Sequence, residues 1–224
     1  MHQDKSIKLS QKTTYRQIQV PSTVFKAYDI RGIIGKELYE DSFYSIGLAL
    51  GYYLSKLQRQ KIVLARDGRI TSPVLALALK QGLLDSGIDV FDIGLVTTPM
   101  MYFATHTKGI DSGVMVTGSH NPINYDGIKI VLSGKTLMQE DIRILYTMIA
   151  EGKRVNGCGK EIELDIMEEY TKRIVSDIQI KRSLKIIVDC GNGTAGLVAP
   201  QVFEKLGCEV IPLYCDVDGR FPNH

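Results

Sequence analysis

K-I-V-L-A-R-D-G-R-I-T-S-P-V-L-A-L-A-L-K-Q-G-L-L-D-S-G-I-D-V-F-D-I, residues 61–93, alternates short apolar runs with a longer run at helical spacing. Lys61–Ala65 and Ile88–Ile93 have the length and apolar content of strands. Thr71–Ser86 predicts a helix, because a proline stands near its start and a glycine follows its end. Strands that alternate with helices are typical of α/β proteins, so this stretch predicts an α/β fold.

The same alternation extends to both sides of this stretch. Further strands are expected at Gly113–Thr117, Gly127–Leu132, Leu184–Asp189 and Glu209–Tyr214. Further helices are expected at Glu40–Lys56, Thr97–Thr107, Leu137–Ile149, Leu164–Asp177 and Thr194–Leu206. The glycine-rich stretch Glu151–Lys160 predicts a linker, which divides residues 21–160 from residues 161–224. We expect the second unit to be incomplete, because one β-α-β segment has too few elements to close an α/β domain.

The N-terminal residues 1–20 are polar and lack the apolar centre of a secretory signal, so they predict a flexible extension. The longest apolar stretch, Ile46–Leu57, is interrupted by Ser55 and Lys56 and is shorter than the roughly 20 residues of a membrane span. Its G-x-x-x-G spacing, Gly47 to Gly51, indicates close packing of a helix in a soluble protein. We therefore expect no membrane partner and a cytoplasmic location.

Composition and charge narrow the function classes. Apolar residues make up 44% of the chain and charged residues 23%, which is typical of a globular protein. A formal net charge of +2 without a basic cluster predicts no nucleic-acid partner. The four cysteines form no C-x-x-C pair and have no histidine at metal-binding spacing, so reduced, mostly buried thiols are expected.

The densest polar segment, T-G-S-H-N-P at Thr117–Pro122, directly follows an apolar strand. Active sites of α/β proteins lie at such strand ends. Gly118 permits a turn and leaves the approach to Ser119 open. The nucleophile elbow of hydrolases, G-x-S-x-G, is excluded because Thr117 and Asn121 stand where it needs glycines. For these residues alone, an ordinary polar surface turn stays an alternative.

Cationic side chains stand in neighbouring segments. The segment Tyr28-Asp29-Ile30-Arg31-Gly32 contains an arginine, whose guanidinium suits phosphate oxygens. In D-G-I-K, Asp126–Lys129, strand alternation separates Lys129 from the flanking isoleucines and places it near Ser119 if both strands share a sheet. Each charge alone is more simply a solvated surface residue. As a set, a dianionic phosphate would suit Arg31, Arg66, Arg69 and Lys129.

These motifs and their order resemble the α-D-phosphohexomutases, and most of all the bacterial phosphomannomutase/phosphoglucomutase branch. The matching segments are F-K-A-Y-D-I-R-G (Phe25–Gly32), A-R-D-G-R (Ala65–Arg69), T-G-S-H-N-P (Thr117–Pro122), D-G-I-K (Asp126–Lys129), V-D-C-G-N-G-T-A-G (Val188–Gly196) and D-G-R-F-P-N-H (Asp218–His224). The resemblance covers nearly the whole chain after residue 24. It implies a mixed sheet sandwiched by helices, with residues 21–160 as domain I and residues 161–224 as the first part of domain II.

The resemblance also implies a reaction. Such an isomerase interconverts hexose 1-phosphate and hexose 6-phosphate, with mannose and/or glucose as the sugar, through a hexose 1,6-bisphosphate intermediate. Ser119 matches the serine that carries the transferable phosphate, one oxygen of which completes a Mg²⁺ site. The other metal ligands are expected beyond His224, so this chain alone is expected to be inactive. The expected partner is a small phosphosugar, and a monomer is favoured.

Further residues are assigned through the same resemblance. His120, Asn121 and Lys129 match residues that line the site. Lys129 is the candidate general base, since a lysine crowded by cations releases its proton more readily. Tyr28 and Arg31 match residues close to the phosphoserine. Arg66 and Arg69 are assigned to substrate binding or to positioning of the loop.

Three other functions have some support in the sequence. Gly191-x-Gly193-x-x-Gly196 follows a strand and meets much of the dinucleotide-binding fingerprint. Asp216 stands about where that fingerprint has its acidic residue. Pro200 near the start of the following helix disfavours that reading, which also leaves the serine loop unexplained. Gly134-Lys135-Thr136 resembles a P-loop, but a lysine occupies the required earlier glycine position. A non-catalytic fragment that binds a phosphosugar or a partner protein is the third possibility.

Overall fold

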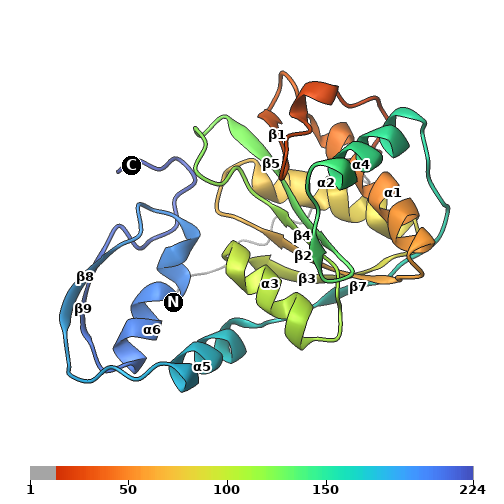
Figure 1. Cartoon of the computed structure of the whole chain (residues 1–224). Helices are drawn as coiled ribbons and strands as arrows, with labels where there is room; N and C mark the ends of the chain where they lie inside the picture. The colour runs from red at the N-terminus through yellow and green to blue at the C-terminus, as the bar shows by residue number, and fades with distance from the viewer. Residues whose placement is uncertain (1–13, 224) are drawn as a thin grey trace.

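The structure is a computed structural model that describes residues 14–223, and its larger part is a seven-stranded mixed sheet (Figure 1). The strand order is β1-β5-β4-β2-β3-β7, and β6 pairs with β5. The strands are β1 (Ile30–Ile33), β2 (Lys61–Arg66), β3 (Asp89–Leu95), β4 (Gly113–Val116), β5 (Tyr125–Leu132), β6 (Lys135–Thr136) and β7 (Glu161–Glu163). β2 is parallel to β3 and β4, whereas β5 is antiparallel to β1 and β4. The predicted mixed α/β fold is confirmed.

Helices cover both faces of this sheet (Figure 1). One face carries α1 (Glu40–Lys56), α2 (Ser72–Asp85) and α4 (Glu140–Ala150), and the other carries α3 (Thr98–Thr107). Successive side chains of β2 alternate between the two cores, with Ile62 and Leu64 in one and Val63 and Ala65 in the other. A strand buried on both faces needs a continuous apolar run, and this explains the sequence of β2.

Two glycine contacts bring α1 and α2 close together. A Cβ atom added to Gly47 would lie 2.4 Å from the carbonyl oxygen of Leu79, and one added to Gly82 would lie 2.4 Å from that of Tyr44. Real Cβ atoms do not approach backbone oxygens so closely, so a side chain at either position would push the helices apart. A Cβ atom added to Gly51 would lie 2.2 Å from Ser86 Cβ, so both glycines of the G-x-x-x-G spacing serve helix packing, as predicted.

The second unit contains a two-stranded parallel sheet of β8 (Lys185–Asp189) and β9 (Glu209–Leu213). Its helices are α5 (Met167–Asp177), the 3-10 turn η2 (Thr194–Leu197) and α6 (Ala199–Lys205). The prediction of one continuous helix over Thr194–Leu206 is wrong. The helix is broken at Val198, whose φ is −131°, and Pro200 takes a place in the first turn of α6, where its missing N–H leaves no bond unmade.

Four short segments differ from the sequence predictions. β1, β6 and the 3-10 turn η1 (Ser22–Val24) are not among the expected elements. Residues 161–163, which begin the predicted second unit, form β7 and pair with β3 as an edge strand of the large sheet. The pairing gives a polar tripeptide its extended conformation, and periodicity alone could not indicate it. The division into two domains stays a prediction.

The predicted flexible extension does not hold for residues 14–20, while residues 1–13 lie outside the described residues. Val20 is 3% exposed and packs into the core. The backbone N–H of Arg16 donates to Asp41 Oδ1 over 2.9 Å, and that of Ile18 donates to Ser45 Oγ over 2.8 Å. Helix α1 thus holds a segment whose polar sequence gives no sign of it. Across residues 14–223, no helix has both the length and the apolar content needed to cross a membrane.

Candidate active site

Ser119 is exposed on the loop that leaves the carboxyl end of β4 and returns as β5. Its φ is +53°, in the left-handed region that residues other than glycine seldom occupy. Such a conformation costs free energy and persists only where neighbouring contacts impose it. Two local hydrogen bonds contribute, from Ser119 N to Thr117 Oγ1 over 2.9 Å and from Asn121 Nδ2 to the Gly118 carbonyl over 2.8 Å.

Arg69 is the main support of this loop. Its Nη1 donates to the carbonyls of Pro122 and Tyr125 over 2.8 and 3.0 Å. Its Nη2 donates to the carbonyls of Ser119 and Asn121 over 3.0 and 2.7 Å. These bonds use four of the five N–H groups of the guanidinium, and the residue is only 2% exposed. Arg69 therefore holds the loop in place, and its assignment to substrate binding stays a prediction.

Position 118 needs a glycine for a reason other than the turn and the open approach to Ser119 that the sequence suggested. A Cβ atom at this position would lie 2.3 Å from Arg69 Nε, because the guanidinium packs flat against the backbone. The φ of Gly118 is not among the positive values. Absence of a side chain here makes room for the arginine beneath the loop.

Two buried carboxyl groups complete the support. Asp67 accepts hydrogen bonds from Thr117 Oγ1 over 2.7 Å and from Ser72 Oγ over 2.6 Å. Asp126 accepts from Ser72 Oγ over 2.9 Å and from Thr71 Oγ1 over 2.8 Å. Burial, and then the charge of Asp67, raise the pKa of Asp126 to about 6. The single Ser72 hydroxyl proton can serve only one of the two carboxyl groups at a time. Below about pH 6 a proton on Asp126 would donate to Ser72 Oγ while Ser72 donates to Asp67.

A second cluster of charged side chains lies on the neighbouring strands β1 and β5 and on the residue before β1. Lys129 Nζ lies 3.6 Å from Asp29 Oδ2, and Arg31 Nε lies 3.9 Å from Asp29 Oδ1. Lys129 is the cross-strand partner of Met115 on β4, and Met115 lines one of the cavities beside Ser119. The structure thus brings Lys129 and Arg31 to one carboxylate, with Tyr28 exposed beside them. The partner of Lys129 in this contact is a carboxylate, whereas the sequence predicts neighbouring cations.

Ser119 borders two cavities, of about 500 and 190 Å³. The larger is lined by residues 119–123 together with Arg69, Arg220 and Phe221. The smaller lies between the two units, with Gly193 and Thr194 on its far side. Phe221 lines both, and its ring centre lies 5.4 Å from the guanidinium carbon of Arg69. Ser119 therefore faces a space that the second unit helps to enclose.

Arg66 does not join this group. It lines a separate cavity of about 450 Å³ with Lys80 and Asp92, beside β7. Burial lowers the pKa of Arg66, and the carboxylates of Asp92 and Asp67 oppose the shift. Arg66 thus lines a cavity other than the two beside Ser119, and Arg69 lies below the loop, so the gathering of four cations around one phosphate stays a prediction.

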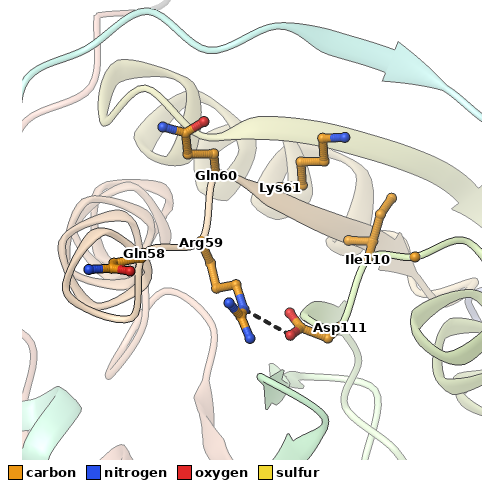
Figure 2. Close-up of a pocket in the computed structure, with 7 residues that line it drawn as sticks. Gln58, Arg59, Gln60, Lys61, Ile110 and Asp111 are labelled. Carbon is orange, nitrogen blue, oxygen red and sulfur yellow. Dashed lines mark hydrogen bonds and ion pairs between the residues drawn. The ribbon is translucent and has the colours of Figure 1, made fainter.

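A further cavity of about 330 Å³ lies at the opposite end of the sheet (Figure 2). It is lined by residues 58–61 and 109–111, and an ion pair of 2.8 Å between Arg59 and Asp111 spans it. These residues precede β2 and β4, whereas ligands of α/β sheets bind at the carboxyl ends of the strands. None of the predicted site residues lines this cavity.

Comparison with known proteins identifies the class. The family described as "Phosphoglucomutase/phosphomannomutase, alpha/beta/alpha domain I" matches residues 22–156, and its "domain II" matches residues 168–224. The chain belongs to the phosphoglucomutase/phosphomannomutase family, and the resemblance of its motifs to this family is confirmed.

Individual relatives agree with this assignment. A phosphomannomutase/phosphoglucomutase of Pseudomonas putida is 47% identical over 92% of this chain and 44% of its own length. A phosphoglucomutase of Neisseria meningitidis is 46% identical over 90% of this chain and 44% of its own length. A phosphoglucomutase/phosphomannomutase family protein of Burkholderia thailandensis superposes with a TM-score of 0.88, at 44% identity, over 92% of this chain and 47% of that one. The chain spans about half the length of the curated relatives it matches.

Sequence reasoning missed several residues that build the site. Asp67 and Asp126 stand in the quoted motifs, but nothing in a sequence separates a buried carboxylate from a surface one. Asp29 was read only as part of the arginine motif. Phe221 stands in a matching segment more than a hundred residues from the loop, and only the docking of the second unit brings it there.

Proposed function

We propose that this chain is the N-terminal part of a phosphosugar mutase that interconverts hexose 1-phosphate and hexose 6-phosphate, with mannose and/or glucose as the sugar. Ser119 would carry the transferable phosphate, and a hexose 1,6-bisphosphate would be the intermediate. The observation that carries the proposal is the exposed Ser119, held at positive φ by the buried Arg69 and facing both cavities. A cytoplasmic monomer whose partner is a small phosphosugar is part of the same proposal.

Phosphoryl transfer depends mainly on alignment and on neutralisation of charge, and the described residues supply both. Arg69 fixes the carbonyls of the loop and so the direction of the Ser119 side chain. His120 Nδ1 lies 3.4 Å from Ser119 Oγ, close enough to contact a phosphate on that oxygen. Asn121 Nδ2 is already bonded within the loop. Its role would be to keep the loop closed.

Lys129 is the proposed general base. A proton must leave the sugar hydroxyl that attacks the phosphoserine, and a lysine can accept it only in its neutral form. Asp29 lies between Lys129 and Arg31, and its carboxylate offsets the positive charge of both side chains. Tyr28, 61% exposed at the same sheet edge, is placed to meet the sugar.

The family relation implies Mg²⁺, and the described residues do not form a site for it by themselves. Within residues 14–223 no group of three or more histidine, cysteine, aspartate or glutamate side chains is placed to hold a metal ion. The buried carboxyl groups near the loop, Asp67 and Asp126, are already engaged by the hydroxyl groups of Thr71, Ser72 and Thr117. A phosphate oxygen on Ser119 would supply one ligand, and further ligands must come from outside the described residues.

The competing nucleotide-binding functions find little support. The glycine-rich turn opens into a short 3-10 turn and a helix of seven residues, not the long helix of a dinucleotide fold. A Cβ atom on Gly196 would lie 1.8 Å from the Cys215 carbonyl oxygen, which gives this glycine a packing role. Gly134 and Lys135 belong to the turn and short strand of the β5-β6 hairpin and not to a phosphate-binding loop.

The deciding experiment is mass spectrometry of the protein isolated from its source cells, which gives its length and the phosphorylation state of Ser119. A phosphate on Ser119 supports the mutase, whereas a native chain ending at His224 with Ser119 never modified favours a non-catalytic fragment that binds a phosphosugar or a partner. Turnover of hexose 1-phosphate is then measured with and without any downstream portion. Ser119→Ala should abolish it, and Ser176→Ala, an exposed serine of α5, should leave it unchanged.

A further inference from the structure

Two cysteines meet where β8 and β9 end. The Sγ atoms of Cys190 and Cys215 lie 3.4 Å apart, and Cys215 Sγ has the carbonyl oxygens of Val188 and Leu213 at the same distance. Both residues are half-buried, Cys158 is exposed, and only Cys208 is buried, so the expectation of mostly buried thiols is wrong. The pair is invisible in the sequence because 24 residues separate its members.

The pair lies just beyond the paired ends of β8 and β9. β8 and β9 pair in parallel up to Asp189 and Leu213, and Cys190 N continues the ladder by donating to the Leu213 carbonyl over 3.0 Å. This register sets Cys190 beside Tyr214, one residue before Cys215. The φ of Tyr214 is +49°, so the chain leaves regular strand geometry there, and Cys215 Sγ comes to lie 3.4 Å from Cys190 Sγ. The two sulfur atoms need to approach to about 2.05 Å, which a rotation about the side-chain bonds can supply.

We propose that Cys190 and Cys215 are a thiol-oxidation site that forms a reversible disulfide with a small-molecule disulfide of the glutathione class. One thiolate of the pair attacks a sulfur of the oxidant, forms a mixed disulfide and releases one reduced thiol. The second thiolate then attacks the cysteine sulfur of that mixed disulfide, which closes the Cys190–Cys215 bond and releases the second reduced thiol. The two cysteines lose two electrons, the oxidant gains them, and the two thiol protons leave on its products.

The surroundings make this site slow to react and place it near the serine loop. Burial, and then the Cys215 thiol and the Asp189 carboxylate, raise the pKa of Cys190 to about 12, so few thiolates exist at neutral pH. The turns that the bond would join are already tied together, since Asp218 N donates to the Asn192 carbonyl over 3.0 Å. Val217, two residues beyond Cys215, packs against Gly68 beside the support of the loop. Oxidation would therefore rigidify the segment that carries Phe221 to Ser119.

The test uses the folded chain in a Cys158→Ser, Cys208→Ser background, which leaves only the proposed pair. The chain is incubated with oxidised glutathione at mildly alkaline pH, and its intact mass and free thiols are measured. The expected result is loss of both thiols and of two hydrogen atoms, with one cross-linked peptide joining Cys190 to Cys215 after digestion. Excess dithiothreitol should restore both thiols.

Matched variants keep the result interpretable. In the same background, Cys190→Ser and Cys215→Ser should each stop at a glutathione adduct, and Cys190→Ala replaces the serine variant if the hydroxyl disturbs folding. The proposal is overturned if the folded chain collects two glutathione adducts, forms only intermolecular bonds, or keeps both thiols while an unfolded sample oxidises. None of these outcomes depends on mutase activity, so the test is separate from that of the proposed function.

Discussion

The two units of this chain use similar apolar strands in very different surroundings. β4 is buried at all four positions, whereas β8, also rich in valine and isoleucine, is buried at none, and its Ile187 is 68% exposed. β4 has a strand on each side and helices on both faces, while β8 has one neighbouring strand. Apolar composition therefore predicts a strand in both cases, but only the surrounding layers decide whether that strand lies in a core. The first unit has its own core, and the second contributes to the site through Val217, Gly219 and Phe221.

The comparison predicts unequal losses for the same substitution in the two units. Phe43→Ala, at a side chain with no exposure in α1, should lower the free energy of unfolding by about 3–5 kcal/mol. Phe203→Ala, at a side chain 37% exposed in α6, should cost about 1 kcal/mol or less. Urea denaturation followed by circular dichroism measures both, and equal losses would show that the second unit has a core of its own.

Removal of the loop's support should be nearly as costly. Arg69→Ala leaves four carbonyls and the Asp67 carboxylate without their partner, with an expected loss of about 3 kcal/mol. Arg69→Lys should recover only part, since an ammonium cannot reach four carbonyls in this planar arrangement. The control is Arg143→Ala on the exposed face of α4, expected to change stability by less than about 0.5 kcal/mol. An Arg69→Ala chain as stable as this control would contradict the proposed support.

The buried carboxyl pair predicts a pH dependence that belongs to the first unit alone. The pKa of Asp126 is raised from 3.8 to about 6, so between these values the folded chain holds a proton that the unfolded chain has lost. The contribution of Asp126 is then most favourable below the unfolded pKa and falls as pH rises through about 6. The full span is about 3 kcal/mol, at roughly 1.4 kcal/mol for each unit by which the pKa of Asp126 is raised.

Asp126→Asn tests this dependence, because an amide can meet the same hydroxyl groups without titrating. The free energy of unfolding, measured at intervals from pH 4 to 7, should lose the downward slope that the unchanged chain shows. Glu140→Gln, at an exposed carboxylate of α4, should leave that slope in place. A slope unaffected by Asp126→Asn would assign it to other groups.

The smallest expected effect concerns the contact between the units. Phe221→Leu removes the ring from the guanidinium of Arg69 and should weaken the contact by about 1 kcal/mol. Hydrogen exchange of the amides in residues 118–125 should become faster, and Phe221→Tyr, which keeps the ring, should preserve their protection. Phe203→Leu, away from the loop, is the matched control. If none of these variants alters exchange, the second unit does not support the loop.

Much of the fold was predictable because it depends on local patterns. α1 begins and ends at the predicted residues, and the ends of α2, α3 and β2 differ by one residue at most, since prolines and glycines mark them. β1 and β7 escaped prediction because they have four and three residues and owe their conformation to β5 and β3. Residues 14–20 are held by α1 through hydrogen bonds from their own backbone, which no side-chain pattern reports.

The α/β class, the position of the serine loop at a strand end and the family can all be inferred from the residues alone, because motif order and hydrophobic periodicity are local properties of the chain. Which charged side chains meet depends on the tertiary fold. Arg69 donates to four carbonyls below the loop, Arg66 lines another cavity, and Lys129 contacts Asp29. Cys190 contacts Cys215. The physical reason is that sheet order and register place side chains from distant segments within reach, and neither is encoded in the neighbours of any one residue.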